Sequence, residues 1–459
     1  MLKLNIRFMK KITETKETNY IKYQKESLRL FLNSFSLLVM VTLYLIMISF
    51  FYNGRIEIDF GIRGYIVLGI LYILISYAFN SAFGTFYIGN KKIMDIALSG
   101  ILSILFISIT MYFVLALIEG HLISVFPHLI LTVIQSLTCL FISYNGTILI
   151  RSKIPPQKTL VIYSDKNYKE ILKKLNKYQI YEFDFVKSES EKKFNYKKDE
   201  LSKYDCILTI DISHNNKKKL VKLCYENNKD MYDIPSITDI VIKSSEVMNF
   251  IDTPIFKMNK LGPSQVEKVI KRIVDLIGAT LMLIVTSPIM IICAIVIKLQ
   301  DGGDVFFRQK RLTIDGKEFE LVKFRSMIMN AEPNGKVIRA KENDSRITAF
   351  GKFIRSTRID ELPQIFNIFT GSMSFVGPRA LRIEEYKENE KNFPEFKYRL
   401  KVKAGLTGYA QIYGKYNTSF RDKLLLDVYY IENYNLIEDF KLLLMTAVTM
   451  LKKDSTEGF

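Results

Sequence analysis

Two adjacent carboxylates, Asp360 and Glu361, have the most distinctive surroundings of any reactive residues in this 459-residue chain. Arg355 and Arg358 precede the pair closely, and Arg379 follows it. Arginine forks suit phosphates and carboxylate oxygens suit Mg²⁺, so the combination indicates a site for a diphosphate and a metal ion. The alternative is a plain helix cap, in which an Asp and a first-turn Glu satisfy backbone amides without any reaction.

The residues that follow predict that this pair lies at the start of a helix. Pro363 is favoured in the first turn of a helix, and an apolar pattern over residues 365–369 continues until Gly371. Unpaired amides and the helix dipole at such a position favour anions and can lower a carboxylate pKa. An ionised Asp360 would then be available as a nucleophile.

The elements that must hold this pair include a membrane anchor. Hydrophobic residues make up 49% of the chain and charged residues 24%, so the two kinds must be segregated along the sequence, as in a membrane protein with a large soluble part. Four apolar runs of nearly membrane-spanning length open the chain, at residues 28–51, 64–83, 93–118 and 122–144. We expect four transmembrane helices, the first of which is too long for a signal peptide and remains as an anchor.

Basic residues indicate which ends of these helices face the cytosol. They precede the first run, separate the second from the third and follow the fourth: Lys10, Lys11, Lys16, Lys22, Lys25, Arg29, Lys91, Lys92, Arg151, Lys153 and Lys158. The opposite loops contain far fewer cations. By the positive-inside rule, both ends of the bundle therefore face the cytosol.

A soluble α/β stretch follows, at about residues 155–260. Strand-like runs at 159–163, 181–186 and 204–210 alternate with Lys-rich helical patterns at 168–177 and 217–226, which favours a small parallel α/β domain. A dinucleotide site would need a glycine-rich turn after the first strand, and the turn at 164–167 has no glycine. A structural or regulatory role is therefore favoured over dinucleotide binding.

A fifth apolar run covers residues 273–297 and contains Ser287 and Pro288. Proline removes a helix hydrogen bond and clashes with the preceding turn, so we expect a break or a kink there. Both flanks of the run are basic, which favours a re-entrant helix that enters from the cytosol, breaks and returns. A plain fifth crossing with a tolerated proline is the alternative.

Several motifs follow in one order from residue 271 onward. They are KRIVD (271–275), the pair Ser287-Pro288, KFRSM (323–327), RSTRIDELPQ (355–364), VGPR (376–379) and GLTGYAQIYG (405–414). The stretch from about 271 to 453 resembles the bacterial sugar transferases, the polyprenyl-phosphate glycosyl-1-phosphate transferases that initiate capsule, exopolysaccharide or related glycan synthesis. The four preceding helices and the α/β stretch are similar to the long form of that family.

This resemblance implies a two-step reaction. Asp360 would attack the sugar-bearing phosphate of a UDP-sugar and release UMP, and undecaprenyl phosphate would then displace Asp360 from the phosphosugar. Glu361 would hold Mg²⁺, since phosphoryl transfer depends on positioning and charge neutralisation. Arg355 would meet the lipid phosphate. The remaining implied substrate-binding residues are Lys323, Arg325 and Arg379 on the donor phosphates, and Gly405, Thr407, Gly408 and Gln411 near the nucleotide.

Two positions depart from the family pattern. Ala380 and Ala404 stand where these transferases usually have proline. Because proline stiffens a loop, the departures bear on loop rigidity and sugar preference more than on the chemistry.

We therefore expect a membrane α-helical bundle, a cytosolic Rossmann-like α/β domain and a mainly α catalytic domain with a re-entrant membrane helix. The expected parts are a cytosolic N-terminal segment (1–27), the four-helix transmembrane domain (28–150), the α/β domain (151–262) and the re-entrant helix with the catalytic domain (263–459). The protein would be a multi-pass protein of the bacterial cytoplasmic membrane, with its catalytic domain on the inner leaflet and a homo-oligomer possible. The run at 436–451 is too short to span and is either interfacial or a buried core helix.

Other classes of protein fit the sequence less well. A transporter would place ionisable residues inside the membrane helices, and these runs have almost none. A non-catalytic scaffold for polysaccharide assembly would lose the carboxylates, which are present. The net charge of +18 suits anionic partners, but the cations accompany membrane-seeking segments rather than a recognition fold, so we expect no nucleic-acid role. The four cysteines contain no CxxC pair and support neither a zinc site nor a disulfide framework.

Overall fold

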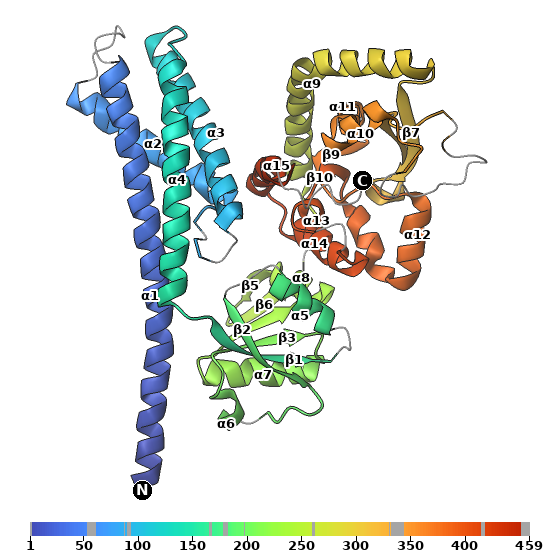
Figure 1. Ribbon diagram of the computed structural model, residues 1–459. Helices are drawn as coiled ribbons and strands as arrows, with labels where there is room; N and C mark the ends of the chain where they lie inside the picture. The colour runs from blue at the N-terminus through green and yellow to red at the C-terminus, as the bar shows by residue number, and fades with distance from the viewer. Residues whose placement is uncertain are drawn as a thin grey trace. The chain divides into compact units, whose positions relative to one another are not determined.

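The computed structural model describes residues 2–52, 61–86, 88–89, 93–164, 168–177, 182–196, 198–258, 262–329, 331, 344–414 and 418–450. The chain forms two compact units, Met1–Ile234 and Pro235–Phe459 (Figure 1). The cations at Lys91 and Lys92 that entered the topology argument lie outside the described residues, as do the side chains of residues 2–23.

Long apolar helices make up the first part of the first unit. They are α1 (Leu2–Met47), which continues in a π-helical turn (Ile48–Tyr52), α2 (Ile62–Phe83), α3 (Ile93–Glu119) and α4 (Phe126–Lys153). All four have segments long and apolar enough to cross a membrane, which confirms the four predicted helical runs. The fourth helix starts later than predicted, because Pro127 occupies its first turn, and it ends later, at Lys153.

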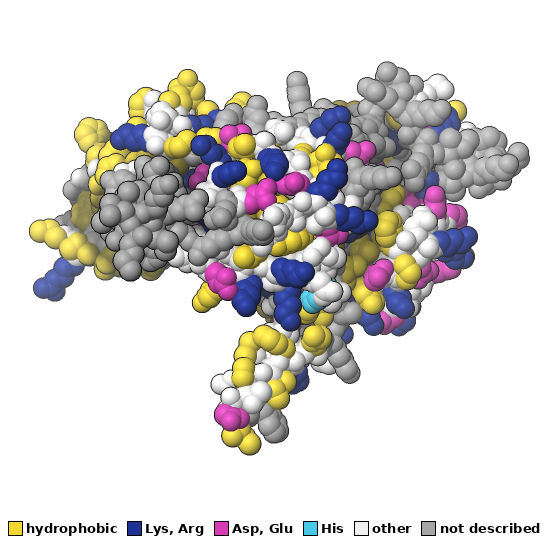
Figure 2. Space-filling view, turned by 90° about the horizontal axis from the view of Figure 1, so that it is seen from below, with side chains coloured by type: hydrophobic (Ala, Val, Ile, Leu, Met, Phe, Trp, Pro, Cys, Tyr) yellow, Lys and Arg dark blue, Asp and Glu magenta, His cyan; other side chains and the backbone are white. Residues whose placement is uncertain are grey.

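Polar groups inside this bundle bond to one another, whereas apolar side chains face outward. Gln135 donates hydrogen bonds to the Met40 carbonyl (2.9 Å) and to the Tyr72 hydroxyl (2.8 Å). Large apolar side chains such as Leu117 and Phe141 are exposed. Figure 2 shows apolar side chains exposed beside Lys and Arg on one face of the molecule. Exposed apolar helix faces of this kind suit a lipid environment.

The rest of the first unit is a four-stranded parallel sheet in the order β2-β1-β3-β4. Its strands are β1 (Gln157–Tyr163), β2 (Phe183–Ser190), β3 (Cys206–Ile210) and β4 (Asp230–Ile234), and its helices are α5 (Tyr168–Lys177), α6 (Lys198–Leu201) and α7 (His214–Glu226). Successive β1 residues pack on opposite faces of the sheet: Leu160 lies in the cluster with Leu220 of α7, and Val161 lies in the cluster beside α5. The predicted parallel α/β architecture is confirmed.

Glu191 directly follows β2, and its carboxylate lies at the N-terminal end of α7, the helix that follows β3. Its carboxylate accepts hydrogen bonds from the Ser213 amide (2.9 Å), the Ser213 hydroxyl (2.8 Å) and the Asn216 side chain (3.0 Å). Burial opposes ionisation of Glu191, but these hydrogen bonds outweigh it and hold its pKa at about 2. The chain's own carboxylate thus takes the Ser213 amide just before α7.

The second unit begins with α8 (Ile237–Lys243) and a hairpin of β5 (Glu246–Phe250) and β6 (Thr253–Lys257). The long helix α9 (Gln265–Asp301) follows, and then a hairpin of β7 (Phe306–Leu312) and β8 (Glu318–Phe324). The remaining elements are α10 (Ala349–Ser356), α11 (Gln364–Thr370), β9 (Met373–Val376), α12 (Ile383–Asn392), β10 (Ala404–Thr407), α13 (Tyr409–Ile412), α14 (Phe420–Glu432) and α15 (Leu436–Met450).

Helix α9 is bent. A capping box of Ser264 and Glu267 starts it, and Pro288 lies inside it. Figure 1 shows the helix turning sharply partway along its length. We attribute the bend to Pro288, which lacks an amide hydrogen, as the sequence predicted.

Polar contacts join the first half of α9 to the core of the second unit. Asp275 accepts hydrogen bonds from the Ser374 hydroxyl (3.0 Å) and the Phe375 amide (3.1 Å), and Lys271 pairs with Asp439 of α15 at 2.5 Å. Arg272 donates to the carbonyls of Ile368 and Phe369 at the C-terminal end of α11. The same α11 follows directly on the Asp360-Glu361 pair, so these contacts connect the membrane-seeking helix to the element beside the carboxylates.

Helix α15 combines the two alternatives considered for residues 436–451. Leu442 is fully buried in the cluster around β9 and β10, whereas Ile437 and Phe440 are exposed. One face of the helix therefore belongs to the core and the other presents apolar side chains, as an interfacial helix does.

Candidate active site

The two carboxylates lie next to Lys323, which the β7–β8 hairpin supplies. Lys323 is at the end of β8, and Asp360 and Glu361 occupy a 3₁₀ turn (Ile359–Glu361) just before α11. The Lys323 ammonium is 2.8 Å from Glu361 and 3.9 Å from Asp360. One cation thus faces both carboxylates, although they come from a segment distant in the sequence.

The backbone just before the pair is strained. Arg358 has a φ of 57°, in the left-handed region, and begins the 3₁₀ turn. A non-glycine residue in this region costs of order 1–3 kcal/mol, and such strain clusters at functional sites. The N-terminal residue of α11, Pro363, makes no side-chain capping hydrogen bond. The carboxylates therefore do not act as the cap of α11, contrary to the alternative for this motif.

The electrostatics distinguish the two carboxylates. Burial raises the pKa of Asp360 to about 6, although Lys323 opposes the shift. Burial also opposes ionisation of Glu361, but Lys323 and Arg379 outweigh it and hold its pKa at about 2. The expectation that helix amides lower the pKa of Asp360 is therefore wrong, because α11 begins only at Gln364 and burial dominates.

Two glycine-rich segments, one after β9 and the other before α13, pack closely together and form the other wall of the site. The Gly377 amide donates to the Thr407 carbonyl (2.8 Å), and the Gly405 amide donates to the Pro378 carbonyl (2.9 Å). A Cβ atom at Gly405 would collide with the Gly377 amide nitrogen, and one at Gly408 with the Gly377 carbonyl oxygen. Glycine is required at these positions because backbone meets backbone.

These segments and the β7–β8 hairpin surround one pocket. Its lining residues are Arg311, Leu321, Lys323, Glu361, Gln364, Met373, Arg379, Ala380, Gly405, Leu406 and Gln411. Arg379 is half exposed and its guanidinium lies 3.9 Å from Glu361. The pocket thus combines cations, one carboxylate and exposed backbone, which are the groups that bind phosphates.

The structure brings most of the predicted site residues together but separates two of them. Lys323, Glu361, Arg379, Gly405 and Gln411 line the pocket, Asp360 faces Lys323, Gly408 packs on Gly377, and Arg355 is close enough to influence the charge of Asp360. Arg325 instead pairs with Asp301 at the end of α9. The Thr407 hydroxyl accepts a hydrogen bond from Thr446 of α15 (2.8 Å), away from the pocket.

Two polar lining residues, Arg311 and Gln364, were not among the predicted site residues. Gln364 ends the RSTRIDELPQ motif, so the motif itself was the available signal. Arg311 lies in β7 with other basic residues, and only the pairing of Arg311 with Phe319 in the hairpin and the fold around it distinguish its position.

The residues fit a bound Mg²⁺ only together with a substrate. The part of the chain that the structure describes has no cluster of three or more His, Cys, Asp or Glu side chains suited to a metal. Mg²⁺ commonly uses one or two carboxylates and completes its shell with water and substrate phosphates. Glu361 and Asp360 would supply the carboxylates, and the buried Oε1 of Gln411, which has no hydrogen-bond partner among the described residues, is a further oxygen in the pocket that Glu361 lines.

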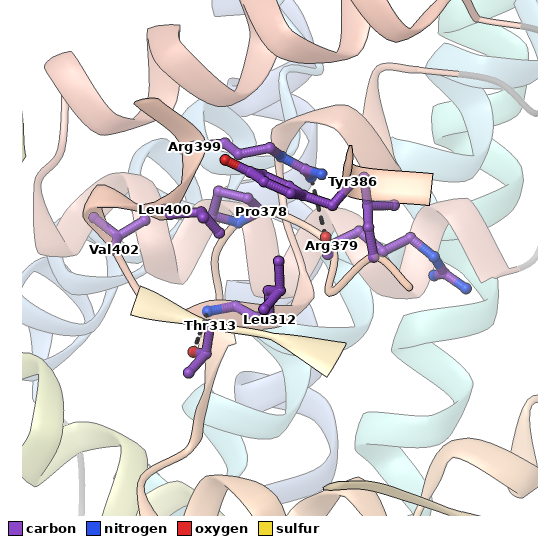
Figure 3. Close-up of a pocket in the computed structure, with 10 residues that line it drawn as sticks. Leu312, Thr313, Pro378, Arg379, Tyr386, Arg399, Leu400 and Val402 are labelled. Atoms are coloured by element: carbon purple, nitrogen blue, oxygen red, sulfur yellow. Dashed lines mark hydrogen bonds between the residues drawn. The ribbon is translucent and has the colours of Figure 1, made fainter. Parts of the chain in front are cut away.

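A second, neighbouring pocket shows how the Arg379 loop is held in place (Figure 3). Arg399 donates a hydrogen bond to the Arg379 carbonyl (3.0 Å) and pairs with the buried Asp427 (2.9 Å). Figure 3 shows the Arg379 side chain extending away from Arg399 and Tyr386. The backbone of Arg379 is thus fixed on one side while its guanidinium is available on the other.

The two positions that lack the family's prolines are held by hydrogen bonds from the end of β7. The Ala404 amide donates to the hydroxyl of the buried Thr313 (3.2 Å), which in turn donates to the Ser372 carbonyl (2.8 Å). Arg311 donates to the Ala380 carbonyl (3.2 Å). A proline at 404 would have no amide hydrogen and could not make this bond. The hydrogen bond to Thr313 thus holds the Ala404 backbone in place, as the rigid ring of a proline would.

Thr313→Val is expected to lower the free energy of unfolding by about 1–3 kcal/mol, because it leaves the buried Ala404 amide without an acceptor. Urea unfolding of the detergent-solubilised protein, followed by tyrosine fluorescence, measures the change. Thr313→Ser keeps the hydroxyl and is the matched control, with a loss well below that of valine. A larger loss in Thr313→Ser than in Thr313→Val would mean that packing of the Thr313 methyl group, and not its hydroxyl, is what matters.

Comparison with known proteins agrees with this site. Residues 266–453 match the sequence profile of the bacterial sugar transferase family. UDP-glucose:undecaprenyl-phosphate glucose-1-phosphate transferase of Klebsiella pneumoniae is 35% identical over 235 residues, which cover 50% of this chain and 50% of that protein. UDP-N-acetylgalactosamine-undecaprenyl-phosphate N-acetylgalactosaminephosphotransferase of Aeromonas hydrophila is 38% identical over 199 residues, covering 42% of this chain and 47% of that protein. A Bacillus subtilis protein described as uncharacterized sugar transferase EpsL is 36% identical over 192 residues, covering 41% of this chain and 91% of that protein.

The chain belongs to the bacterial sugar transferase family. It spans about half the length of the Klebsiella and Aeromonas relatives and nearly all of EpsL. The matched region contains every residue of the pocket described above.

Proposed function

We propose that this protein transfers a sugar 1-phosphate from a UDP-sugar to undecaprenyl phosphate, giving undecaprenyl-diphosphate-sugar and UMP, at the start of exopolysaccharide, capsule or related glycan synthesis. The observation that carries the proposal is the arrangement of Asp360, Glu361 and Lys323 beside a pocket that also contains Arg379. The relatives from Klebsiella and Aeromonas are named for this type of reaction with different sugars, glucose and N-acetylgalactosamine. The family therefore supports the reaction type and leaves the sugar open.

The proposed chemistry has two displacement steps at one phosphorus. The Asp360 carboxylate attacks the sugar-bearing phosphorus, the bond to the bridging oxygen breaks, and UMP leaves with that oxygen and the electron pair. An oxygen of undecaprenyl phosphate then attacks the same phosphorus, and the aspartate carboxylate is the leaving group. Asp360 must be ionised to attack. Its pKa of about 6 leaves it mostly ionised at neutral pH, with the Lys323 ammonium 3.9 Å away.

The remaining residues bind and orient the substrates. Lys323 and Arg379 contact the donor phosphates, and Arg355, close to Asp360, meets the lipid phosphate. Glu361, with Asp360 and the Gln411 amide oxygen, would hold Mg²⁺, which supplies charge neutralisation for phosphoryl transfer. The close-packed backbone of Gly377, Gly405 and Gly408 would form one side of the nucleotide site.

The proposed topology places this chemistry on the inner leaflet of the bacterial cytoplasmic membrane. The bent helix α9, with Ser287 and Pro288, would be re-entrant, so that the catalytic residues and the cytosolic UDP-sugar share one side. The α/β domain would not take part in catalysis, since the turn after its first strand lacks glycine and the proposed reaction residues all lie beyond residue 271.

A second candidate is a non-catalytic scaffold, which would keep the fold without turnover. A panel of UDP-sugars incubated with the purified protein, undecaprenyl phosphate and Mg²⁺ tests the choice by UMP release. We expect UMP from at least one donor, dependent on the lipid for continued turnover. No UMP from any donor, in protein shown to be folded and to bind UDP, would favour the scaffold.

A further inference from the structure

The charges around the pocket are not balanced by the protein. Arg311, Lys323 and Arg379 line it, and Glu361 is the carboxylate among its lining residues. With Asp360, which lies 3.9 Å from Lys323, three cations face two carboxylates, which leaves a formal surplus of one positive charge. The Lys323 ammonium pairs with Glu361 at 2.8 Å, so Arg311 and the half-exposed Arg379 account for the surplus positive charge.

Arg311 is held rigidly, yet it keeps donors to spare. Its guanidinium donates to the Ala380 carbonyl (3.2 Å) and to the Gln309 side chain (2.6 Å). A guanidinium has five N–H donors, and the Nε of Arg311 is buried without a hydrogen-bond partner among the described residues. A fixed planar fork with unused donors is suited to phosphate oxygens.

Neighbouring cations also destabilise the positive charge of Arg311, which favours an anion in the pocket. Burial lowers the pKa of Arg311 to about 10, and the nearby Arg382 and Arg379 add to the shift, while Glu384 and Glu385 oppose it. A cation that is partly buried among other cations is stabilised when an anion enters the pocket beside it.

The position of Arg311 in the pocket also bears on the donor-binding residues predicted from the sequence. Three residues were expected on the donor phosphates, Lys323, Arg325 and Arg379, but Arg325 pairs with Asp301. Arg311 lines the pocket with Lys323 and Arg379, where Arg325 does not.

We propose that Arg311 is a diphosphate-binding residue, which with Lys323 and Arg379 holds the two ionised phosphates of the nucleotide-sugar donor. The inference rests on the proposed function for the identity of the donor. It assigns Arg311 to binding rather than to bond breaking, because Arg311 contacts the Ala380 carbonyl and, in the part of the chain that the structure describes, makes no contact with Asp360. Loss of Arg311 therefore affects donor affinity and not the lipid acceptor.

The test compares Arg311→Met with Arg308→Met in the full-length protein. Arg308 is on the same strand but exposed, and its contact is a long ion pair with Glu320 at 3.5 Å. Two quantities are measured: the dissociation constant of UDP by calorimetry, and the KM values for the UDP-sugar and for undecaprenyl phosphate. Arg311→Met is expected to weaken UDP binding and to raise the donor KM by about tenfold or more, as for the loss of a charged hydrogen bond. The lipid KM should stay within about twofold, and Arg308→Met should resemble the native protein.

Unchanged UDP affinity and donor KM in folded Arg311→Met would overturn the inference and leave Arg311 as a structural support for Ala380. If the methionine variant does not fold, Arg311→Lys replaces it, since lysine keeps the charge but loses the fork. Weaker UDP binding by folded Arg311→Lys supports the inference, and native affinity overturns it. Arg311-dependent UDP binding by a native protein that releases no UMP from any donor would refute the proposed function while supporting the diphosphate site.

Discussion

Asp360→Asn is expected to reduce UMP release at least about a thousandfold, because an amide is not an equivalent phosphoryl acceptor and removal of a covalent nucleophile has effects of this order or larger. The fold should survive. The described structure shows no capping hydrogen bond at the start of α11, and the contact of Asp360 with Lys323 is long, at 3.9 Å. The amide is also nearly the same size as the carboxyl group.

The control for this variant is Asp315→Asn. Asp315 is exposed in a 3₁₀ turn with a φ of 55°, a conformation that asparagine adopts readily, so the same chemical change there should leave turnover and stability unaltered. Both variants are compared by initial rates of UMP release and by thermal unfolding in detergent. Substantial turnover by folded Asp360→Asn would remove Asp360 from the role of nucleophile.

Cysteine labelling should show which side of the membrane the catalytic domain faces, and the expected result is all or none. Lys310 lies on β7, after α9, and its side chain is 70% exposed, so Lys310→Cys should react readily with a thiol reagent that reaches it. If α9 is re-entrant, a membrane-impermeant maleimide should label this cysteine in inverted membrane vesicles and not in intact spheroplasts. Removing the 3.7 Å pair with Glu318 costs little, because both partners are exposed.

Leu122→Cys provides the opposite control. Leu122 is 74% exposed between α3 and α4, on the side that the positive-inside rule places outside the cell. It should be labelled in spheroplasts. Three native cysteines are buried and Cys139 is partly buried, which keeps background labelling low. Labelling of Lys310→Cys from outside would show that α9 crosses the membrane, and the cytosolic donor would then have no access to Asp360.

The fold was predictable where local pattern determines it. Runs of apolar residues as long as a bilayer is thick identified α1 to α4, and the strand-like run at 159–163 identified β1, whose successive side chains pack on opposite faces of the sheet. Boundaries were less accurate, as at α4, where Pro127 delays the start. The division of the second unit into short helices and strand pairs was not predictable, because segments such as β9 and β10 gain their stability from pairing with each other.

The site was predictable to the extent that motifs contain it. The adjacent carboxylates, Lys323, Arg379 and the glycines of 405–408 all came from short motifs, and the structure brings them together. What the sequence could not show is which arginine among many faces the pocket. Arg311 and Arg325 both lie among basic residues, and only the tertiary fold places Arg311 in the lining of the pocket and pairs Arg325 with Asp301. Burial, which reverses the expected pKa shift of Asp360, is likewise a tertiary property.

The covalent role of Asp360 is tested most directly by trapping the enzyme without its lipid acceptor. Native protein and Asp360→Asn are incubated with a reactive UDP-sugar and Mg²⁺ in delipidated detergent, quenched, and analysed by intact-protein and peptide mass spectrometry. We predict that the native protein gains the mass of one sugar phosphate on the peptide containing Asp360, with release of an equivalent amount of UMP, and that Asp360→Asn gains none. A native enzyme that turns over with lipid yet never acquires this mass would contradict the account and favour direct transfer between the two substrates.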